Sequence, residues 1–313
     1  GNFLGIIFNA GINTGLFPLF IFMAVGAMTD FGPLIANPKS FLLGAAAQGG
    51  IFFTFIFAGL FFTGKEASSI AIIGGADGPT AIYVSSKLLS GGGAIDTGTI
   101  ALAAYTYMAL VPIVQPFAIK LVTTKKERQI RMTYHPGEVS KELRIAFPIV
   151  VTFIVGLVSP SSVALVGFLM FGNLIRECGV LGTMSETAQN TLANLITLFL
   201  GITISFSMQA EAFVQVDTLL IMGIGLLAFV FDSIGGVLFA KIINLFSKTK
   251  VNPMIGAAGI SAFPMSSRVV QKLALKEDPQ NILIMHAAGA NVSGQIASVV
   301  AGGLIINLIS SYL

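Results

Sequence analysis

Apolar runs long enough to cross a bilayer recur along almost the whole of this 313-residue chain. A helix that spans the hydrocarbon core takes about 20 mostly apolar residues. The runs are continuous rather than alternating, which favours helices over a closed barrel of strands. The sequence therefore predicts an all-α polytopic membrane protein with a single integral-membrane domain over 1–313. We expect apolar segments at 14–28, 41–62, 67–89 (interrupted), 98–122, 142–158, 161–176, 187–207, 218–246, 252–275 (interrupted) and 280–311.

Composition excludes the soluble classes. Only 10% of residues are charged and 55% are hydrophobic, whereas soluble domains carry about 25% charged residues. The net charge of +3 gives no reason to expect a nucleic-acid partner. The single cysteine, Cys178, rules out an intrachain disulfide. The chain begins without Met and without a charged leader, so we expect an incomplete N-terminus rather than a signal peptide.

One connecting segment is long and basic. The stretch 123–144, "TTKKERQIRMTYHPGEVSKELR", lies between two apolar segments. Because positive charge accumulates in cytoplasmic loops, we expect residues 123–141 to form a cytoplasmic basic loop. The loop either serves only to set the topology or also docks an acidic soluble partner. Its basic residues are Lys125, Lys126, Arg128, Arg131, Lys141 and Arg144.

An internal repeat indicates two related halves. The stretch 74–87, "GGADGPTAIYVSSK", matches 255–268, "IGAAGISAFPMSSR", at an offset of 181 residues. A weaker echo pairs "GAMTDF" with "SMQAEAF", upstream of the two matched stretches. We expect a first repeat at 1–122, incomplete at its N-terminus, and a second at 142–313. The repeats are inverted if each half has one re-entrant element, and parallel if every element crosses; a chance match of Gly/Ala-rich strings is the alternative.

Both repeats contain an interrupted helix. Glycine and proline release backbone groups from the helical ladder. At membrane depth this is tolerated only where the backbone faces protein or water. Paired interrupted helices commonly hold the ion site of a transporter near the midplane. We therefore expect 74–80 and 252–261 to be non-helical and to face each other.

The lone carboxylate of the first break, Asp77, is the strongest candidate site residue. An ionised Asp in hydrocarbon is costly, and no Lys or Arg lies within a turn of it. A bound cation, or a proton when the cation leaves, is then the natural counter-charge. Carboxylate, amide and hydroxyl oxygens suit sodium better than soft metals. The alternative is a structural cap for a helix with Pro79 in its first turn, which does not exclude ligation.

Other polar residues in apolar surroundings are weaker candidates. Asn252 precedes Pro253 at the second break, and Asn291 lies in the last helix among hydroxyls and amides. Such groups often serve only to hold membrane helices together. Asp232 is either a second cation ligand or paired locally. Arg268 either complements the C-terminal end of its helix or receives an anionic substrate.

Through the motifs given below, the chain resembles the integral-membrane beta subunit of the sodium-translocating biotin-dependent decarboxylases. The resemblance covers essentially all 313 residues, although family members begin with further membrane sequence. It implies a subunit that decarboxylates carboxybiotin, exports sodium and consumes a proton. The motifs that carry it are "GAMTDF", "NPKSFLLGAAAQ", "IIGGADGPTAIYVSSKL", "YTYMALVPIVQP", "LVTTKKERQIRM", "FGNLIRECGV", "NPMIGAAGISAFPMSSRVVQ" and "HAAGANVSGQIAS".

The resemblance also implies site residues. The family's sodium ligands match Asp77, Asn252, Gly256, Ser261 and Asn291 in this chain. Tyr107 and Ser261 match its candidate proton-delivery hydroxyls, and together with Asp77 and Arg268 they form the expected catalytic set. Arg268 is also expected to bind the carboxylate of carboxybiotin. The family's "HAMGPNVAG" reads here as "HAAGANVSG", so alanine replaces the proline before Asn291 and Ser293 replaces an alanine.

Partners and location follow from the same resemblance. It implies a carboxyltransferase and biotin-carrier alpha subunit that supplies carboxybiotin, a small membrane gamma or delta subunit, homo-oligomers, and the bacterial inner membrane. The fuel, whether oxaloacetate, methylmalonyl-CoA, glutaconyl-CoA or malonate, is left open, as is the number of sodium ions per turnover. A sodium-coupled secondary transporter or sodium/proton antiporter is the alternative that composition and repeat alone favour. An anchor without chemistry is disfavoured by the buried Asp and the breaks.

Overall fold

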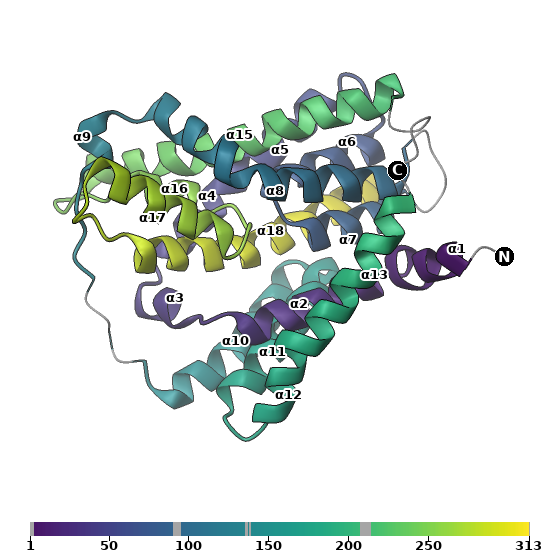
Figure 1. Ribbon diagram of the computed structural model, residues 1–313, viewed down its shortest axis with the longest axis horizontal. Helices are drawn as coiled ribbons and strands as arrows, with labels where there is room; N and C mark the ends of the chain where they lie inside the picture. The colour runs from purple at the N-terminus through teal and green to yellow at the C-terminus, as the bar shows by residue number, and fades with distance from the viewer. Residues whose placement is uncertain (1–2, 90–94, 135–136, 138, 207–213, 313) are drawn as a thin grey trace.

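The computed structural model describes residues 3–89, 95–134, 137, 139–206 and 214–312 (Figure 1). Every regular element within these ranges is a helix, which confirms the all-α prediction. The main helices are α2 (Leu16–Met28), α4 (Ser40–Ala47), α5 (Gly49–Ala58), α6 (Gly64–Ala71), α7 (Gly78–Leu88), α8 (Thr97–Val122), α10 (Lys141–Val158), α11 (Val163–Glu177), α13 (Ala193–Phe206), α15 (Val216–Phe246), α17 (Met265–Glu277) and α18 (Ile284–Tyr312).

Four helical stretches are long and apolar enough to cross a membrane. They cover Ser40–Ala58, Thr97–Val122, Val216–Phe246 and Ile284–Ile309. A fifth candidate is the pair Phe3–Asn13 and Leu16–Met28, which is bent by 60° at its break. Because each long span carries at most two charged residues in its apolar window, the chain is a multi-pass membrane protein.

The helices fall into two groups. In the first, α4, α5, α6, α7, α8, α15, α17 and α18 pack together and contain both interrupted stretches (Figure 1). In the second, α2 packs along α11, with α10 and α13 beside them (Figure 1). Close approach of α2 and α11 depends on two glycines, because a Cβ at Gly26 or at Gly172 would overlap the other helix's backbone carbonyl at Leu169 or Met23. Small residues at such contacts are how membrane helices pack closely.

Both predicted breaks are present, but neither stretch is wholly non-helical. A 3₁₀ turn covers Ile72–Gly75, and α7 already begins at Gly78, so the first break is narrower than 74–80. In the second, one helical turn, α16, forms at Met254–Ala257, and α17 begins only at Met265. If the second repeat followed the first at an offset of 181 residues, α17 would begin at Gly259, the residue aligned with Gly78 at the start of α7. Pro264 explains the delay, because it lacks an amide hydrogen and disfavours helical geometry in the residue before it.

The basic loop is more structured than expected. A short helix, α9 (Lys125–Arg128), begins with an N-terminal capping box between Thr124 and Glu127. Ser140 caps α10, so Lys141 belongs to that helix rather than to the loop. The repeat itself remains a prediction, and the echo "SMQAEAF" at 207–213 lies outside the described residues.

Candidate functional site

The sequence "GGADGPT" builds a sharp corner between a 3₁₀ turn and a helix. Ala76 adopts a left-handed conformation with φ of 52°, which L-residues rarely adopt. Asp77 follows in an extended conformation as the N-cap of α7, and Pro79 lies in the first turn of that helix. Asp77 is therefore a helix cap, as the alternative interpretation predicted, and it has further contacts.

The Asp77 carboxylate is buried and held by two hydroxyl groups. Its Oδ1 accepts a hydrogen bond from the Thr80 backbone amide at 3.2 Å. Its Oδ2 accepts from Thr80 Oγ1 and from Ser298 Oγ, both at 2.7 Å. The side chain lies 6% exposed, and no described Lys or Arg pairs with it. Among the described residues, the charge of Asp77 thus has neutral donors but no cationic partner.

The two breaks meet at one carbonyl group. The Gly75 carbonyl oxygen accepts hydrogen bonds from the Ser261 backbone amide at 3.0 Å and from Ser261 Oγ at 2.9 Å. Gln48, at the corner between α4 and α5, donates from Nε2 to the Gly259 carbonyl at 3.0 Å. Segments almost two hundred residues apart therefore satisfy each other's released backbone groups, as the burial of non-helical backbone requires.

Helix α18 lines both breaks with three polar side chains. Asn291 Nδ2 donates to the Ile260 carbonyl at 2.7 Å, and Gln295 Nε2 donates to the Ser261 carbonyl at 3.4 Å. Ser298 reaches Asp77, as described above. The spacing of four and three residues puts them on one helix face. The Oδ1 of Asn291 and the Oε1 of Gln295 are buried and accept no hydrogen bond from any described residue.

A cavity of about 490 Å³ opens beside Asp77. Its polar wall includes Asp77, Tyr105, Ser261 and Gln295, and the rest is mostly apolar. The Tyr105 ring packs over the backbone at Gly78, where a Cβ would lie 2.7 Å from the ring. The Tyr105 hydroxyl is buried without a hydrogen-bond partner among the described residues. Helices α2 and α13 of the second group close the opposite side through Phe22, Thr197, Leu200 and Ser205.

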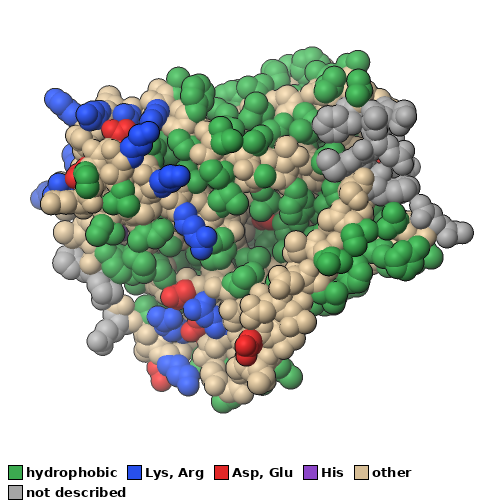
Figure 2. Space-filling model, in the orientation of Figure 1, with side chains coloured by type: hydrophobic (Ala, Val, Ile, Leu, Met, Phe, Trp, Pro, Cys, Tyr) green, Lys and Arg blue, Asp and Glu red, His purple; other side chains and the backbone are tan. Residues whose placement is uncertain are grey.

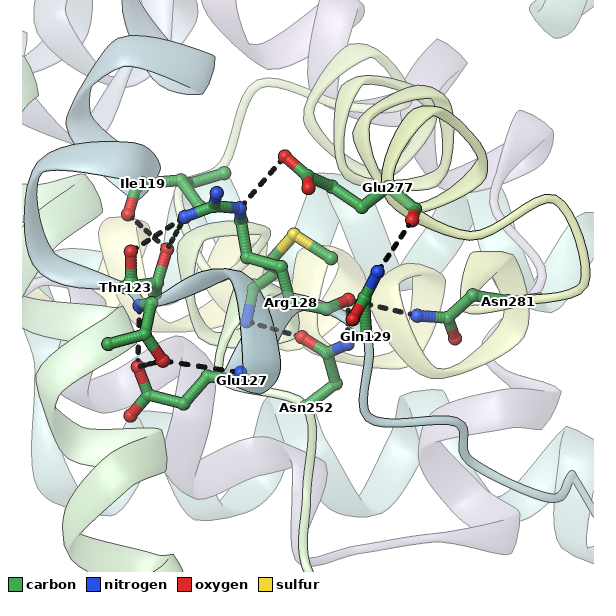
Figure 3. Close-up of polar contacts among 10 residues, drawn as sticks. Ile119, Thr123, Glu127, Arg128, Gln129, Asn252, Glu277 and Asn281 are labelled. Atoms are coloured by element: carbon green, nitrogen blue, oxygen red, sulfur yellow. Dashed lines mark hydrogen bonds and ion pairs between the residues drawn. The ribbon is translucent and has the colours of Figure 1, made fainter.

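Asn252 lies elsewhere, at the basic loop (Figure 3). Its Nδ2 donates to the backbone carbonyls of Arg128 at 2.9 Å and Ile130 at 2.8 Å. Its Oδ1 accepts from the Met254 backbone amide at 3.0 Å. The side chain is fully buried, and both of its polar atoms are occupied by backbone groups. In this arrangement Asn252 offers no free oxygen to a cation at Asp77.

Three further predicted residues also lie outside the cluster around Asp77. Gly256 packs against the backbone of α15, where a Cβ would overlap the Gly236 carbonyl. The Tyr107 hydroxyl donates to the Met222 carbonyl on α15. Arg268 is exposed on α17. Of the predicted set, the structure brings together Asp77, Ser261 and Asn291.

Four residues of the cluster were absent from the predicted set: Thr80, Tyr105, Gln295 and Ser298. The sequence held partial signals for them. The Asp-Gly-Pro-Thr order is a helix start in which Thr80 is the third helical residue, and Gln295 and Ser298 stand among apolar residues on the last helix. Nothing in the sequence alone shows which of two tyrosines, Tyr105 or Tyr107, faces the carboxylate.

Asp232 is a second buried carboxylate, on α15. It is 0% exposed, and its oxygens have no hydrogen bond of good geometry to a described residue. It sits against the glycines of two neighbouring elements, since a Cβ at Gly50 or at Gly74 would collide with its carboxyl oxygens. Gly74 belongs to the first break, so a carboxylate lies on each side of that turn.

The cluster around Asp77 supplies one carboxylate, two free amide oxygens and several hydroxyls next to a cavity. This donor set suits a hard monovalent cation, and hydroxyls are also groups that pass protons. Among the described residues, no three His, Cys, Asp or Glu side chains gather in a way that would hold a soft metal.

Comparisons with known proteins agree with this chemistry. The family model described as "Na+-transporting oxaloacetate decarboxylase beta subunit" matches residues 1–309. The methylmalonyl-CoA decarboxylase subunit beta of Propionigenium modestum is 54% identical over 301 residues, which is 95% of this chain and 75% of the relative. The oxaloacetate decarboxylase beta chain of Klebsiella pneumoniae is 49% identical over 313 residues, 98% of this chain and 71% of the relative. The methylmalonyl-CoA decarboxylase subunit beta of Veillonella parvula is 49% identical over 307 residues, 98% of this chain and 81% of the relative.

Proposed function

The chain belongs to the family of sodium-transporting oxaloacetate decarboxylase beta subunits, and on this premise we propose that the cavity beside Asp77 couples decarboxylation to sodium export. The observation that carries the proposal is the buried Asp77 carboxylate, held by two hydroxyls where two interrupted helices meet. A membrane carboxylate without a basic partner needs a cation or a proton.

Sodium is the proposed cargo of this site. Asp77 supplies the charge that offsets dehydration of the ion, and Ser261, Asn291 and Gln295 supply neutral oxygens. The free amide oxygens of Asn291 and Gln295 support this assignment. Asn252 and Gly256 remain candidate ligands only if the second break rearranges, because Asn252 is bonded to the loop backbone.

The chemistry is loss of carbon dioxide from carboxybiotin delivered by a carrier. The bond between the ureido nitrogen and the carboxyl carbon breaks, its electron pair stays on nitrogen, and nitrogen takes a proton. We assign proton delivery to Tyr105 and Ser261, which line the cavity, with Tyr107 as the competing hydroxyl. Arg268 is the proposed partner of the substrate carboxylate, since guanidinium groups bind carboxylates through paired hydrogen bonds.

A beta subunit works with other subunits. The proposed partners are an alpha subunit with carboxyltransferase and biotin-carrier functions and a small gamma or delta membrane subunit. The proposed setting is the bacterial inner membrane, with the beta subunits as homo-oligomers. Relatives named for oxaloacetate and for methylmalonyl-CoA are similarly close to this chain, so similarity does not choose the fuel.

The test uses the complex reconstituted in vesicles, with carboxybiotin decarboxylation and sodium uptake measured together. Asp77→Asn keeps the size and one carbonyl oxygen but removes the charge, so both activities should fall together by at least about a hundredfold, the scale of several kcal/mol of lost ion stabilisation. Carboxyl transfer to biotin by the other subunit should be unchanged. Near-normal turnover with intact sodium uptake would reduce Asp77 to a helix cap.

Asp96 provides a matched control. It caps α8 in the same way, accepting hydrogen bonds at 2.7 Å from Thr99 N and Thr99 Oγ1, but it is exposed. Asp96→Asn should therefore cost about 1 kcal/mol of stability or less and leave both activities in place. A sodium/proton antiporter, the alternative function, would move sodium in wild-type vesicles without carboxybiotin.

A further inference from the structure

The outer face of α17 carries three cations in a row. Arg268, Lys272 and Lys276 are exposed and spaced four residues apart, so they lie one above the other along the helix. The opposite face is buried through Val270 and Leu273. We call Arg268, Lys272 and Lys276 the basic stripe.

The basic stripe has no ion-pair partner among the residues that the structure describes. None of its members forms an ion pair with a carboxylate in the described part of the chain. The arginines of the basic loop behave differently, since Arg128 pairs with Glu277 at 3.0 Å and Arg131 pairs with Asp278 at 2.6 Å. Like charges one turn apart destabilise a helix. The nearest carboxylates, Glu277 and Asp278, are taken by Arg128 and Arg131, so a row of three cations without a described ion-pair partner favours a negative group from outside the chain.

The position of the basic stripe indicates which anion. Helix α17 begins at Met265, just after Ser261 and Phe263, which line the cavity beside Asp77. Helix α17 ends at Glu277, which accepts hydrogen bonds from Arg128 and Gln129 of the basic loop. From Arg268 to Lys276 the helix rises about 12 Å. Figure 2 shows Lys and Arg side chains in a line across this part of the molecule, from the region of α9 toward the hollow between the two helix groups.

We propose that the basic stripe is the entry track for the carboxylate of carrier-borne carboxybiotin. The inference rests on the proposed function. A surface lined by one sign of charge raises the local concentration of the opposite charge. The two lysines act as point charges that hand the anion on, and Arg268 receives it in a paired geometry.

The basic stripe also favours entry of carboxybiotin over retention of the biotin product. Carboxybiotin enters with a negative charge on its carboxylate. After decarboxylation the biotin ring is neutral, because carbon dioxide has left and the ureido nitrogen carries a proton. The basic stripe therefore attracts the substrate and does not retain the product.

The test measures decarboxylation of carboxybiotin supplied as its methyl ester, in which the side-chain carboxylate is masked as it is on the carrier, by the reconstituted complex carrying Lys272→Gln, Lys276→Gln or both. Each single change should raise KM for carboxybiotin roughly threefold, the scale of one exposed charge interaction, and the double change roughly tenfold. The maximal rate and the sodium concentration for half-maximal rate should not change. Added choline chloride at constant sodium should raise KM less in the double variant than in the wild type.

Two controls separate charge from structure. Lys272→Arg should keep the wild-type KM, because it keeps the charge. Lys248→Gln removes an exposed lysine that lies beyond the end of α15 and outside the basic stripe. This variant should also have the wild-type KM. An unchanged KM in the double variant, or a lower maximal rate at unchanged KM, would overturn the track while leaving the proposed function intact. A wild-type complex that does not decarboxylate carboxybiotin would instead overturn the proposed function.

Discussion

At the scale of single residues, the buried oxygens around Asp77 are divided between occupied and free. Thr80 and Ser298 donate to Asp77, whereas the oxygens of Tyr105, Asn291 and Gln295 have no partner among the described residues. A buried polar atom without a partner is costly. We therefore propose that an ion or substrate binds on the side of the cluster where these atoms lie.

The two tyrosines of α8 should respond differently to loss of the hydroxyl. Tyr105→Phe removes a group that faces the cavity, so turnover should fall by about a hundredfold or more if it delivers the proton, with little change in stability. Tyr107→Phe removes a second donor from the Met222 carbonyl, which still accepts from its own helix. The change should therefore cost only about 1 kcal/mol of stability, with near-normal turnover of the folded protein. Turnover and thermal unfolding of both purified variants decide the assignment; the reverse pattern would restore Tyr107 as the proton donor.

Ser298 tests whether α18 belongs to the site. Ser298→Ala removes one of the two hydroxyls on Asp77 Oδ2, so the anion loses about 1.5–3 kcal/mol of charge-assisted hydrogen bonding. The sodium concentration for half-maximal decarboxylation should change clearly, and sodium titration of the variant measures it. Ser293→Ala is the matched control, because Ser293 donates to the Ser40 and Ala290 carbonyls instead. Equal behaviour of the two variants would argue against a role for Ser298 in the ion site.

At the scale of elements, the basic loop holds the start of the second break. The Arg128 carbonyl accepts from Asn252 and also from Asn281 Nδ2 at 3.0 Å (Figure 3). Beside this cluster, the Arg131 guanidinium holds the pKa of Asp278 below its usual range through a hydrogen-bonded ion pair. Asn252 is thus part of a joint between α9, α16 and the turn before α18.

This joint predicts an unusual result for Asn252→Asp. A carboxylate can accept from the Met254 amide but cannot donate to the carbonyls of Arg128 and Ile130. We expect a loss of about 2 kcal/mol or more of stability, with an unchanged sodium requirement in the folded fraction. Asn281→Ala should produce a similar but smaller effect by removing the second donor to Arg128. Thermal unfolding and sodium titration are the measurements; a sodium requirement that shifts in Asn252→Asp alone would favour direct ligation.

The sequence predicted the helices well because their apolar runs are long, and it predicted the breaks because Gly and Pro have local effects. It did not predict the start of α17, where Pro264 moved the helix beyond its counterpart at Gly78. It grouped Asn252 with Asp77 because both stand in broken segments. Only the packing shows that Asn252 bonds to the loop, whereas on a third element Ser298 bonds to the Asp77 carboxylate and Gln295 to the Ser261 carbonyl beside it.

At the scale of the whole molecule, the charges predict an orientation in the membrane. Three of the six basic residues at 123–144 are paired with carboxylates, Arg128, Arg131 and Arg144, which leaves Lys125, Lys126 and Lys141 exposed. The positive-inside rule counts all of them, so this end of the molecule is still expected on the cytoplasmic side, next to the carrier.

A cysteine at Ser140 tests that orientation. Because Ser140 is at the exposed start of α10, an impermeant thiol reagent should label it in inverted vesicles and not in intact cells. The labelling is done in a Cys178→Ser background, and a cysteine near the opposite end of α8, at Thr99, should give the reverse pattern. Labelling of the Ser140 position in intact cells would reverse the proposed topology. The two halves should also superpose in an experimental structure if the repeat at 1–122 and 142–313 is real.

The hydrogen bonds between Gly75 and Ser261 also bear on how the protein is made. They join residues 186 positions apart, so the first broken helix leaves the ribosome long before its partner exists. Until the second half is synthesised, the Gly75 carbonyl lacks its donor Ser261 and the Asp77 carboxylate lacks its donor Ser298. Apolar lipid offers neither group a hydrogen bond. We therefore expect the newly made first half to stay in a wetter place, at the membrane surface or beside the insertion machinery. Only the completed chain can bury it.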